Sequence, residues 1–252
     1  MNEIRLSVLV VVHNEEDHLE ECLKALSFAD ERVVVLDRCT DGSKAIAEMH
    51  AEHLLEGDWE REGPRRNAGI DACRGQWIFE VDADERVQED LGREVRRVAQ
   101  ASTFDWHEVP VDNYIGTRLV RWGWGGSFGT TAVPRVFRKG VKVWGGQWVH
   151  PTLIWQGQKG PRLRHALQHY VDRNISEMIS RLDRYTTARA RDLRESGRPG
   201  SLAANLRRLF SRFFKCYVGR KGYREGGWGF LIALFAGLYP LLSYLKATLE
   251  QE

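Results

Sequence analysis

The chain has 252 residues, 42% of them hydrophobic, and its 37 Lys and Arg residues nearly balance its 35 Asp and Glu residues. This length allows one large domain or a domain with an appendage. A net charge of only +2 argues against a protein that binds nucleic acid over its whole surface. Cys22, Cys39, Cys73 and Cys216 lack metal-ligand spacing and are typical of free thiols in a reducing compartment. The first residues lack the apolar segment and cleavage site of a signal peptide, so we expect a cytoplasmic catalytic region.

Three apolar runs, at residues 6–12, 33–36 and 78–81, are continuous and not alternating. Such runs are typical of parallel strands covered by helices on both faces. Between the first two, apolar residues at helical spacing predict a helix within residues 14–29, capped by Asn14. Residues 41–55 predict a second helix entered through an Asp-Gly-Ser turn, and residues 64–72 a third. This order of strands and helices is typical of the N-terminal part of an open α/β sheet.

The second half of the chain differs from the first in amino-acid composition. Residues 105–155 are rich in Trp and Gly and predict short, irregular strands and loops. Beyond Gly160 the chain becomes helical and basic, and "SGRPGS" at residues 196–201 is the best candidate for a linker. We therefore expect a catalytic domain at residues 1–160 and a helical C-terminal region at residues 161–252.

Two carboxylates follow the third apolar run directly. Side chains alternate along a strand, so Asp82 and Asp84 are expected to point the same way, with Ala83 toward the packing. Two unpaired carboxylates about 4 Å apart repel by roughly 4 kcal/mol at an effective dielectric constant near 20. A divalent cation removes that cost, and oxygen ligands at the carboxyl end of a strand favour Mg²⁺ or Mn²⁺ that also holds a diphosphate. The alternative is that both residues cap the next turn and face water.

The segments "VVVHNEE", "VVVLDRCTDGS" and "RRNAGIDACRGQWIFEVDADE" follow one another in the first 90 residues. In content and order they resemble the inverting family-two glycosyltransferases of the GT-A fold. The resemblance implies a Rossmann-like, mostly parallel α/β sheet with flanking helices. It also implies a nucleotide-sugar donor, expected to be a UDP-sugar, and Mg²⁺ or Mn²⁺ as cofactor.

The resemblance also implies which residues form the donor site. Asp82 is expected nearer the ribose and Asp84 on the metal, and the equivalent of Asp37 binds the nucleotide base. The further positions expected to line the nucleotide pocket or contact the diphosphate are His13, Glu15 and Arg66. The alternatives are structural: Asp37 begins a turn, and Arg66 is a charge on a helix surface.

Two later segments, "PRVFRKGVKVWGGQWVHP" and "YVGRKGYREGGWGFLIALFAGLYPLLSYLK", resemble the lipopolysaccharide-core β-1,4-glucosyltransferase-like group. That group usually has Glu after Val-His, whereas Pro151 follows His150 here. An inverting transfer needs a base for the acceptor hydroxyl. Asp112 is the first candidate, with Glu108 and His150 as competitors. His150 is also a candidate for the metal shell, and the Trp and Gly loop at residues 122–128 for stacking on a sugar.

The C-terminal region carries the pattern of a membrane-associating protein. Residues 202–218 form a basic amphipathic helix of the kind that lies on an anionic membrane surface. Residues 226–245 contain no charged residue, but Pro240 and four glycines favour a shallow or re-entrant segment over a spanning helix. The alternative is a helix packed against the catalytic domain. We expect a peripheral protein on the inner face of the cytoplasmic membrane.

The sequence thus predicts metal-dependent, inverting transfer of a sugar from a UDP-hexose such as UDP-glucose. The expected acceptor is a hydroxyl of a membrane-linked glycan, in lipopolysaccharide-core or cell-envelope synthesis. One alternative is a polyprenyl-phosphate glycosyltransferase, whose phosphate acceptor needs no strong base, and another is an inactive membrane-bound glycan-binding scaffold. The sequence has no Gly-x-Gly-x-x-Gly after the first strand and no Walker loop, so nicotinamide redox and ATPase activities lack support.

Overall fold

The structure is a computed structural model, and it describes residues 5–125 and 128–250. The chain forms two compact units. Unit 1 comprises Met1–Val111, Ala132–Gln147 and Pro151–His169, and unit 2 comprises Asp112–Thr131, Trp148–His150 and Tyr170–Glu252. This division differs from the boundary expected after residue 160, because two inner segments group with the C-terminal helices and residues 161–169 group with the N-terminal part.

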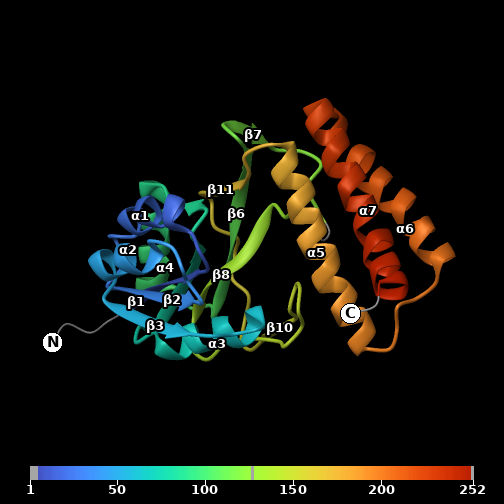
Figure 1. The fold of residues 1–252 in the computed structure, drawn as a ribbon. Coiled ribbons are helices and arrows are strands. Elements are labelled where there is room, and N and C mark those ends of the chain that lie inside the picture. Colours follow the sequence, from blue (N-terminus) through green and yellow to red (C-terminus); the bar gives the residue numbers. More distant parts are fainter. Residues whose placement is uncertain (1–4, 126–127, 251–252) are drawn as a thin grey trace. The chain divides into compact units, whose positions relative to one another are not determined.

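The strands of unit 1 begin with four parallel neighbours in the order β3-β2-β1-β4 (Figure 1). Their bounds are β1 Leu6–Val12, β2 Glu31–Asp37, β3 His53–Gly57 and β4 Trp77–Asp82. The sheet continues through β8 (Ala132–Arg138), β6 (Trp106–Ile115), β11 (Leu167–Asp172) and β5 (Glu85–Arg86), with antiparallel pairing of β4 with β8, β8 with β6 and β11 with β5. In unit 2, β7 (Arg118–Val120) pairs with the end of β6. A separate two-stranded sheet joins β9 (Lys142–Trp144) and β10 (Leu153–Trp155).

Helices cover both faces of this parallel sheet, as the continuous apolar runs predict. Alternate β1 residues, among them Val8 and Val10, are fully buried with α1 (Glu16–Ala25), α2 (Ser43–His50) and α4 (Glu89–Ala101). Leu9 points the other way and is buried with Ile70 of α3 (Glu62–Ala72). Each such side chain contributes roughly 1.5–3 kcal/mol by leaving water, so burial on both faces holds the parallel strands between the two layers of helices.

The structure confirms the three predicted strands and the helix that ends at Ala72, and it corrects two other predictions. The helix predicted over residues 41–55 ends at His50, and the chain then forms β3, which pairs in parallel with β2. The pairing with β2 outweighs the helical pattern. Asn14 does not cap α1: its φ is 57°, and its Oδ1 accepts a hydrogen bond from the Thr40 N–H at 2.8 Å.

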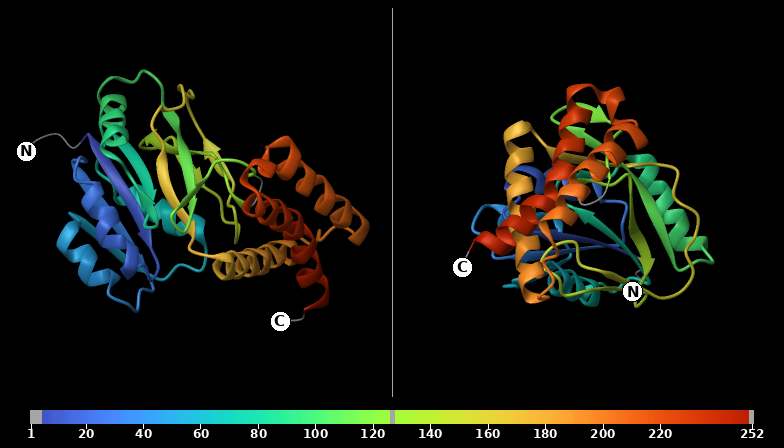
Figure 2. Two further views of the ribbon diagram at one scale, coloured as in Figure 1. Left: turned by 90° about the horizontal axis from the view of Figure 1, so that it is seen from above. Right: turned by 90° about the vertical axis from the view of Figure 1, so that its right-hand side faces the viewer.

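Unit 2 is built on three helices, α5 (Ile175–Glu195), α6 (Leu202–Phe214) and α7 (Gly227–Leu249) (Figure 2). The predicted linker at residues 196–201 connects α5 to α6. Two of the glycines that argue against a spanning α7 have a packing role. A Cβ on Gly237 would lie 2.6 Å from the Leu209 carbonyl oxygen, and one on Gly229 would lie 1.8 Å from that of Gly222. Gly229 and Gly237 thus let α7 approach the preceding segments of its own unit closely.

Within the described residues, α7 is the one helix long and apolar enough to cross a membrane, judged by length and composition. Its most apolar window has a mean hydropathy of 1.7, and half of that window is buried inside the protein. Ile232, Phe235 and Ala236 of α7 pack in the core of unit 2 with Met178 and Leu182 of α5. The predicted apolar segment is therefore partly a core helix.

The Trp and Gly loop differs from the predicted stacking surface. Trp124 is 2% exposed and packs in the core of unit 2 with Phe128, and its indole N–H donates to the Val120 carbonyl at 2.6 Å. Trp122 is 38% exposed, with Lys221 and Arg224 over its ring. Gly126 and Ser127 of this loop lie outside the described residues. The prediction was therefore wrong for Trp124.

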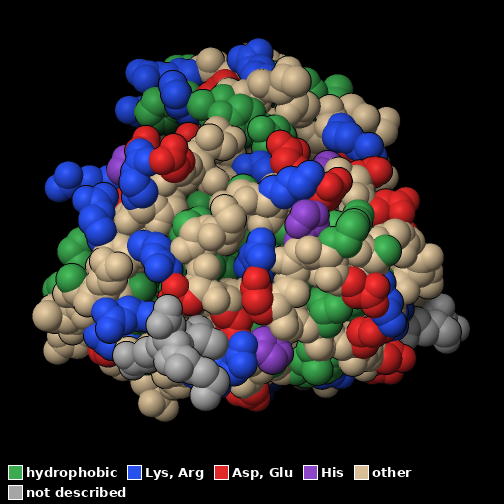
Figure 3. Space-filling view, turned by 90° about the vertical axis from the view of Figure 1, so that its left-hand side faces the viewer, with side chains coloured by type: hydrophobic (Ala, Val, Ile, Leu, Met, Phe, Trp, Pro, Cys, Tyr) green, Lys and Arg blue, Asp and Glu red, His purple; other side chains and the backbone are tan. Residues whose placement is uncertain are grey.

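Charges of both signs share the face of the molecule shown in Figure 3, where Lys and Arg side chains are interspersed with Asp and Glu. A mixed surface of this kind lacks the single-sign field with which proteins attract nucleic acid over a broad face. This agrees with the near-zero net charge of the sequence.

Candidate functional site

The candidate site in unit 1 is centred on Asp82, the last residue of β4. Its carboxylate accepts a hydrogen bond from Arg66 Nη2 at 2.8 Å and lies against the guanidinium of Arg135, whose Nη1 is 3.3 Å from Oδ1. Arg135 Nη2 also lies 3.5 Å from Glu85 Oε1, and the Asp82 N–H donates to Glu85 Oε2 at 2.7 Å. Two buried arginines therefore hold one carboxylate at the carboxyl end of the sheet.

The burial of this cluster shifts the ionisation of its carboxyl groups in opposite directions. Burial alone would raise the pKa of Asp82, but Arg135 and Arg66 outweigh it and hold that pKa well below the usual range. Burial raises the pKa of Glu85 to about 7, because the attraction of Arg135 is opposed by the neighbouring Asp82. Asp82 is therefore the fixed negative charge of the cluster at neutral pH.

Asp84 lies in the turn between β4 and β5 and has a different environment. Its Oδ2 is 3.3 Å from Nε2 of His169, and its side chain is 34% exposed. Burial opposes the imidazolium, but Asp84, together with Glu85 and Asp82, outweighs that effect and raises the pKa of His169 to about 9. A protonated His169 beside Asp84 therefore supplies positive charge where a metal ion is predicted.

Helix α3 positions Arg66 because it packs tightly against the turn after β9. A Cβ on Gly63 would lie 1.7 Å from the Gly145 carbonyl oxygen, so this contact requires glycine. Asn67 exchanges two hydrogen bonds of 2.9 Å with the backbone of Trp144. The Arg66 guanidinium lies 4.9 Å from the centre of the Trp144 ring. Arg66 is thus a buried residue with a fixed orientation and not a charge on a helix surface.

Asp37, predicted to bind the base, is the last residue of β2 and is fully buried. Its carboxylate accepts hydrogen bonds from Arg65 at 2.8 Å, from Arg38 at 3.0 and 3.1 Å, and from the Trp59 N–H at 3.1 Å. Burial raises its pKa, but Arg38, the Trp59 N–H and Arg65 outweigh this and lower it. A role in base recognition stays a prediction.

The loops after β1 and β2 are tied together by hydrogen bonds. His13 Nδ1 lies 2.7 Å from the Asp37 carbonyl oxygen, and the Glu15 N–H donates to Ser43 Oγ at 2.9 Å. Asp41 accepts the N–H groups of Ser43 and Glu16, both at 3.0 Å. These hydrogen bonds hold the two loops together at the carboxyl edge of the sheet, where His13, Glu15 and Asp37 lie. Contact of these residues with a nucleotide stays a prediction.

The candidates for the catalytic base lie in different environments. Glu108 of unit 1 is paired with Lys159 at 2.6 Å and Arg162 at 3.2 Å, and these partners lower its pKa, the bond from Lys159 most. Asp112 is a half-buried residue of β6 that belongs to unit 2. His150, also of unit 2, has a φ of 49° and packs its ring against Tyr185 and Tyr239. The catalytic roles of Asp112 and His150 stay predictions.

The donor set for a metal is small. In the part of the chain that the structure describes, no group of three or more His, Cys, Asp or Glu side chains is placed to hold an ion. Mg²⁺ often binds through one or two carboxylates together with substrate phosphates, and Asp84 with Asp82 fits that pattern. His150 belongs to unit 2, and its predicted place in the metal shell stays a prediction.

Arg135, Glu85 and His169 complete the cluster, and sequence reasoning did not assign them to it. Arg135 begins the basic "RVFR" stretch within the segment "PRVFRKGVKVWGGQWVHP", and Glu85 directly follows Asp84, so both had a signal in the sequence. His169 had none, because it reaches the cluster through the antiparallel pairing of β11 with β5, which sets it opposite Glu85.

Residues 7–127, which include β1 to β4 and the Asp82 turn, match the model of Glycosyl transferase family 2. Residues 7–127 therefore form a Glycosyl transferase family 2 domain, and the chain is a glycosyltransferase with an α/β GT-A fold and a C-terminal apolar helix.

It is 25% identical over 266 residues to the lipopolysaccharide core biosynthesis glycosyltransferase LpsC of Rhizobium meliloti (strain 1021), covering 96% of this chain and 91% of LpsC. It is also 20% identical over 273 residues to an uncharacterized glycosyltransferase of Rickettsia bellii (strain RML369-C), covering 98% and 88%. Among solved structures, residues 1–349 of S. aureus TarS match with a TM-score of 0.51 at 13% identity, over 75% of this chain and 66% of that one. At that identity the likeness concerns the fold alone.

Proposed function

We propose that this glycosyltransferase transfers a sugar from a nucleotide-sugar, a UDP-hexose such as UDP-glucose, to a hydroxyl of a membrane-linked glycan of the lipopolysaccharide core. The name of LpsC, which is similar along nearly the whole chain, supports the pathway. The observation that carries the donor chemistry is the placement of Asp82, Arg66 and Arg135 beside Asp84 at the carboxyl edge of the sheet. Ligands of open α/β sheets bind at that edge.

The residues of this cluster have distinct proposed roles. Asp84 and Asp82 would hold Mg²⁺ or Mn²⁺, which when bound neutralises charge on the leaving diphosphate. Arg66 and Arg135 orient Asp82 and place two guanidinium groups beside the proposed diphosphate position, where bidentate contacts with phosphate oxygens are possible. Asp112 would accept the proton of the acceptor hydroxyl.

The donor chemistry is tested by measuring the release of UDP from a panel of UDP-, GDP- and ADP-sugars, with and without EDTA. We expect turnover with a UDP-hexose that EDTA abolishes. Asp84→Asn should lower kcat at least about a hundredfold while the melting temperature stays near that of the wild type. The control is Glu48→Gln, which changes an exposed carboxylate on α2 and should leave kcat unchanged. Full activity of Asp84→Asn in EDTA would refute the metal-assisted mechanism.

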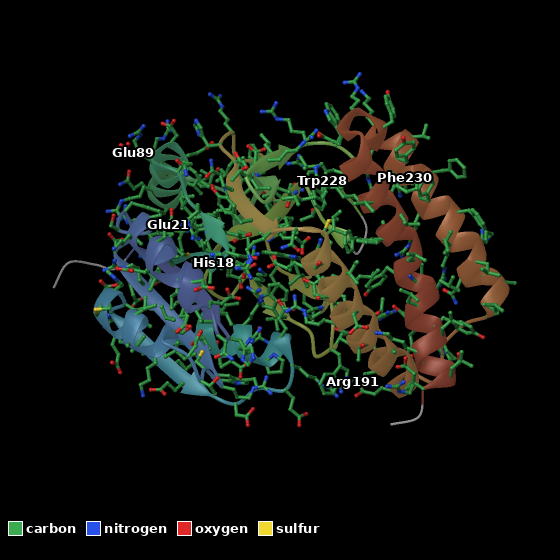
Figure 4. All side chains as sticks on the ribbon, turned by 45° about the horizontal axis from the view of Figure 1, so that its top comes forward. His18, Glu21, Glu89, Arg191, Trp228 and Phe230 are labelled. Atoms are coloured by element: carbon green, nitrogen blue, oxygen red, sulfur yellow. The ribbon has the colours of Figure 1, made fainter. Side chains whose placement is uncertain are left out.

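Membrane attachment is proposed from the surface of unit 2. Five large apolar side chains spaced four residues apart are each more than 40% exposed along α6 and the turn after it: Leu202, Leu206, Phe210, Phe214 and Val218. Phe230, near the beginning of α7, is also exposed, whereas Trp228 beside it in the sequence packs against the core of unit 2 (Figure 4). Exposed Arg207 and Lys215 accompany the stripe. An apolar stripe with basic neighbours fits an anionic membrane surface, here the inner face of the cytoplasmic membrane.

Co-sedimentation with phosphatidylglycerol vesicles tests this attachment. The double variant Phe210→Ser with Phe214→Ser removes two exposed aromatic rings and should weaken partitioning at least about tenfold, since each ring contributes of order 1 kcal/mol or more on burial. Met49→Ser removes an exposed apolar side chain of α2, in unit 1, and serves as the control. Equal partitioning of the two variants would exclude α6 as the membrane contact.

A further inference from the structure

Unit 2 contains a cavity of about 290 Å³ that is lined by α5, α6, α7 and the turn at Val149 and His150. Three arginines supply its charge: Arg189 comes from α5, and Arg208 and Arg212 come from α6. The remaining polar lining includes His150, Asn205 and Ser243. This cavity is at the lower end of the usual size range of ligand sites, about 300–1,000 Å³, and it therefore suits a small group and not a whole oligosaccharide.

The described lining of this cavity contains no Asp or Glu. One lining arginine has an acidic partner: the carboxylate of Asp192 lies 3.5 Å from Arg189 Nη1. Asp192 is 8% exposed and accepts the N–H groups of Trp148, at 2.8 Å, and Val149, at 3.4 Å. This carboxylate therefore holds the turn that carries His150, and it pairs with only one of the three arginines that line the cavity.

In the described part of the chain, neither of the two α6 arginines forms a salt bridge with an Asp or Glu side chain. Arg208 Nη1 donates to the neutral Asn205 Oδ1 at 3.3 Å. Arg212 Nη1 is buried and has no hydrogen-bond partner among the described residues. Burial is the largest effect on the pKa of Arg212 and lowers it; Tyr239 and Cys216 oppose this, and repulsion from Arg208 and Arg189 adds to it. A buried cation without a compensating partner costs stability unless a ligand supplies the opposite charge.

We propose that this cavity binds a phosphate group. The planar fork of a guanidinium matches two oxygens of a phosphate, and arginines from two different helices converge on the same space. The phosphate is carried either by a phosphorylated saccharide or by the headgroup of an anionic phospholipid, and both present the same tetrahedral anion. The site is separate from the arginines around Asp82, which belong to unit 1. It does not depend on the proposed sugar transfer, because its test measures binding alone.

Adjacent arginines on α6 provide matched variants, since Arg208 and Arg212 line the cavity and Arg207 does not. Binding of inorganic phosphate and of glucose 6-phosphate to the full chain is measured by calorimetry, with sodium chloride at equal ionic strength as reference. We expect Arg208→Gln and Arg212→Gln to weaken binding at least about tenfold and Arg207→Gln less than about twofold. Without phosphate, Arg212→Gln should melt near or above the wild-type temperature, since it removes a half-buried cation whose buried Nη1 has no hydrogen-bond partner among the described residues.

Vesicles of phosphatidylcholine with and without phosphatidic acid distinguish the two sources. If a lipid headgroup is the ligand, phosphatidic acid vesicles displace glucose 6-phosphate from the wild-type protein, and phosphatidylcholine vesicles do not. If a phosphorylated saccharide is the ligand, glucose 6-phosphate binds and vesicles do not displace it. The proposal is overturned if neither phosphate compound nor phosphatidic acid binds more tightly than chloride. It is equally overturned if Arg207→Gln weakens the binding of glucose 6-phosphate as much as Arg212→Gln does.

Discussion

The Asp82 cluster predicts a large loss of stability when Arg135 is replaced with Gln. The Arg135 side chain is 10% exposed and contacts both Asp82 and Glu85. Removing one partner of a buried ion pair costs about 3–5 kcal/mol, because the remaining charge stays buried. Asp82 keeps Arg66 at 2.8 Å and its side chain is 26% exposed, so we expect the lower end of that range, about 3 kcal/mol.

Urea unfolding followed by tryptophan fluorescence measures this loss. With an m-value of about 3 kcal/mol/M, the midpoint of Arg135→Gln should fall by about 1 M. Lys159→Gln breaks the more exposed pair with Glu108 and should cost less than about 1 kcal/mol. In the double variant with Asp82→Asn, the two losses should fall short of additivity by about 2 kcal/mol. Equal midpoints for Arg135→Gln and Lys159→Gln would refute the reasoning.

Three further predictions concern packing, pH and thiol chemistry. Gly63→Ala places a Cβ 1.7 Å from the Gly145 carbonyl oxygen and should lower the urea midpoint, whereas Gly146→Ala, with nothing within 4 Å, should not; equal midpoints contradict the packing of α3. Burial raises the pKa of Glu31, but hydrogen bonds from Ser7 and Arg74 outweigh it and lower it. Glu31 therefore stabilises the fold above its unfolded pKa near 4.3, and this is lost as pH falls through the folded pKa, so Glu31→Gln should cost more at pH 7 than at pH 3 in urea unfolding. Cys39 is half-buried and the other three cysteines are buried, so iodoacetamide at pH 9 should modify Cys39 first by mass spectrometry, and bound UDP should slow it; unchanged labelling places the nucleotide elsewhere.

The parallel strands could be predicted because burial on both faces leaves a mark in the sequence. The apolar run at residues 6–12 has the bounds of β1, since nearly every side chain in that strand is buried. β3 left no such mark: it lies at the edge of the sheet, and none of its residues is fully buried. Its pairing with Val33, Val34 and Val35 of β2 decides its conformation, and that contact is not visible in residues 53–57 alone.

The contacts of the charged residues could likewise not be predicted from the local sequence. The position of Asp82 at the end of an apolar strand was visible in the sequence, but its partner Arg135 lies 53 residues further along the chain. In α6, Arg208 and Arg212 belong to the basic amphipathic helix predicted at residues 202–218, and the sequence does not show that they also line a cavity. The structure places both in the lining of a cavity, because α6 packs within unit 2. Helical periodicity gives the faces of α6 but does not say which neighbour each face meets.

The two aspartates that looked equivalent in the sequence differ in the structure, and the difference assigns them separate expected effects. Asp82 has both oxygens engaged by buried arginines, so a cation that bound it would meet two like charges. Asp84 is more exposed and faces His169, a group that can lose its proton or turn away. A metal ion entering the site therefore meets less repulsion at Asp84. This predicts that Asp84→Asn removes the response of the activity to Mn²⁺ at little cost in stability, while Asp82→Asn lowers the urea midpoint first. Loss of the Mn²⁺ response in Asp82→Asn but not in Asp84→Asn would reverse the assignment.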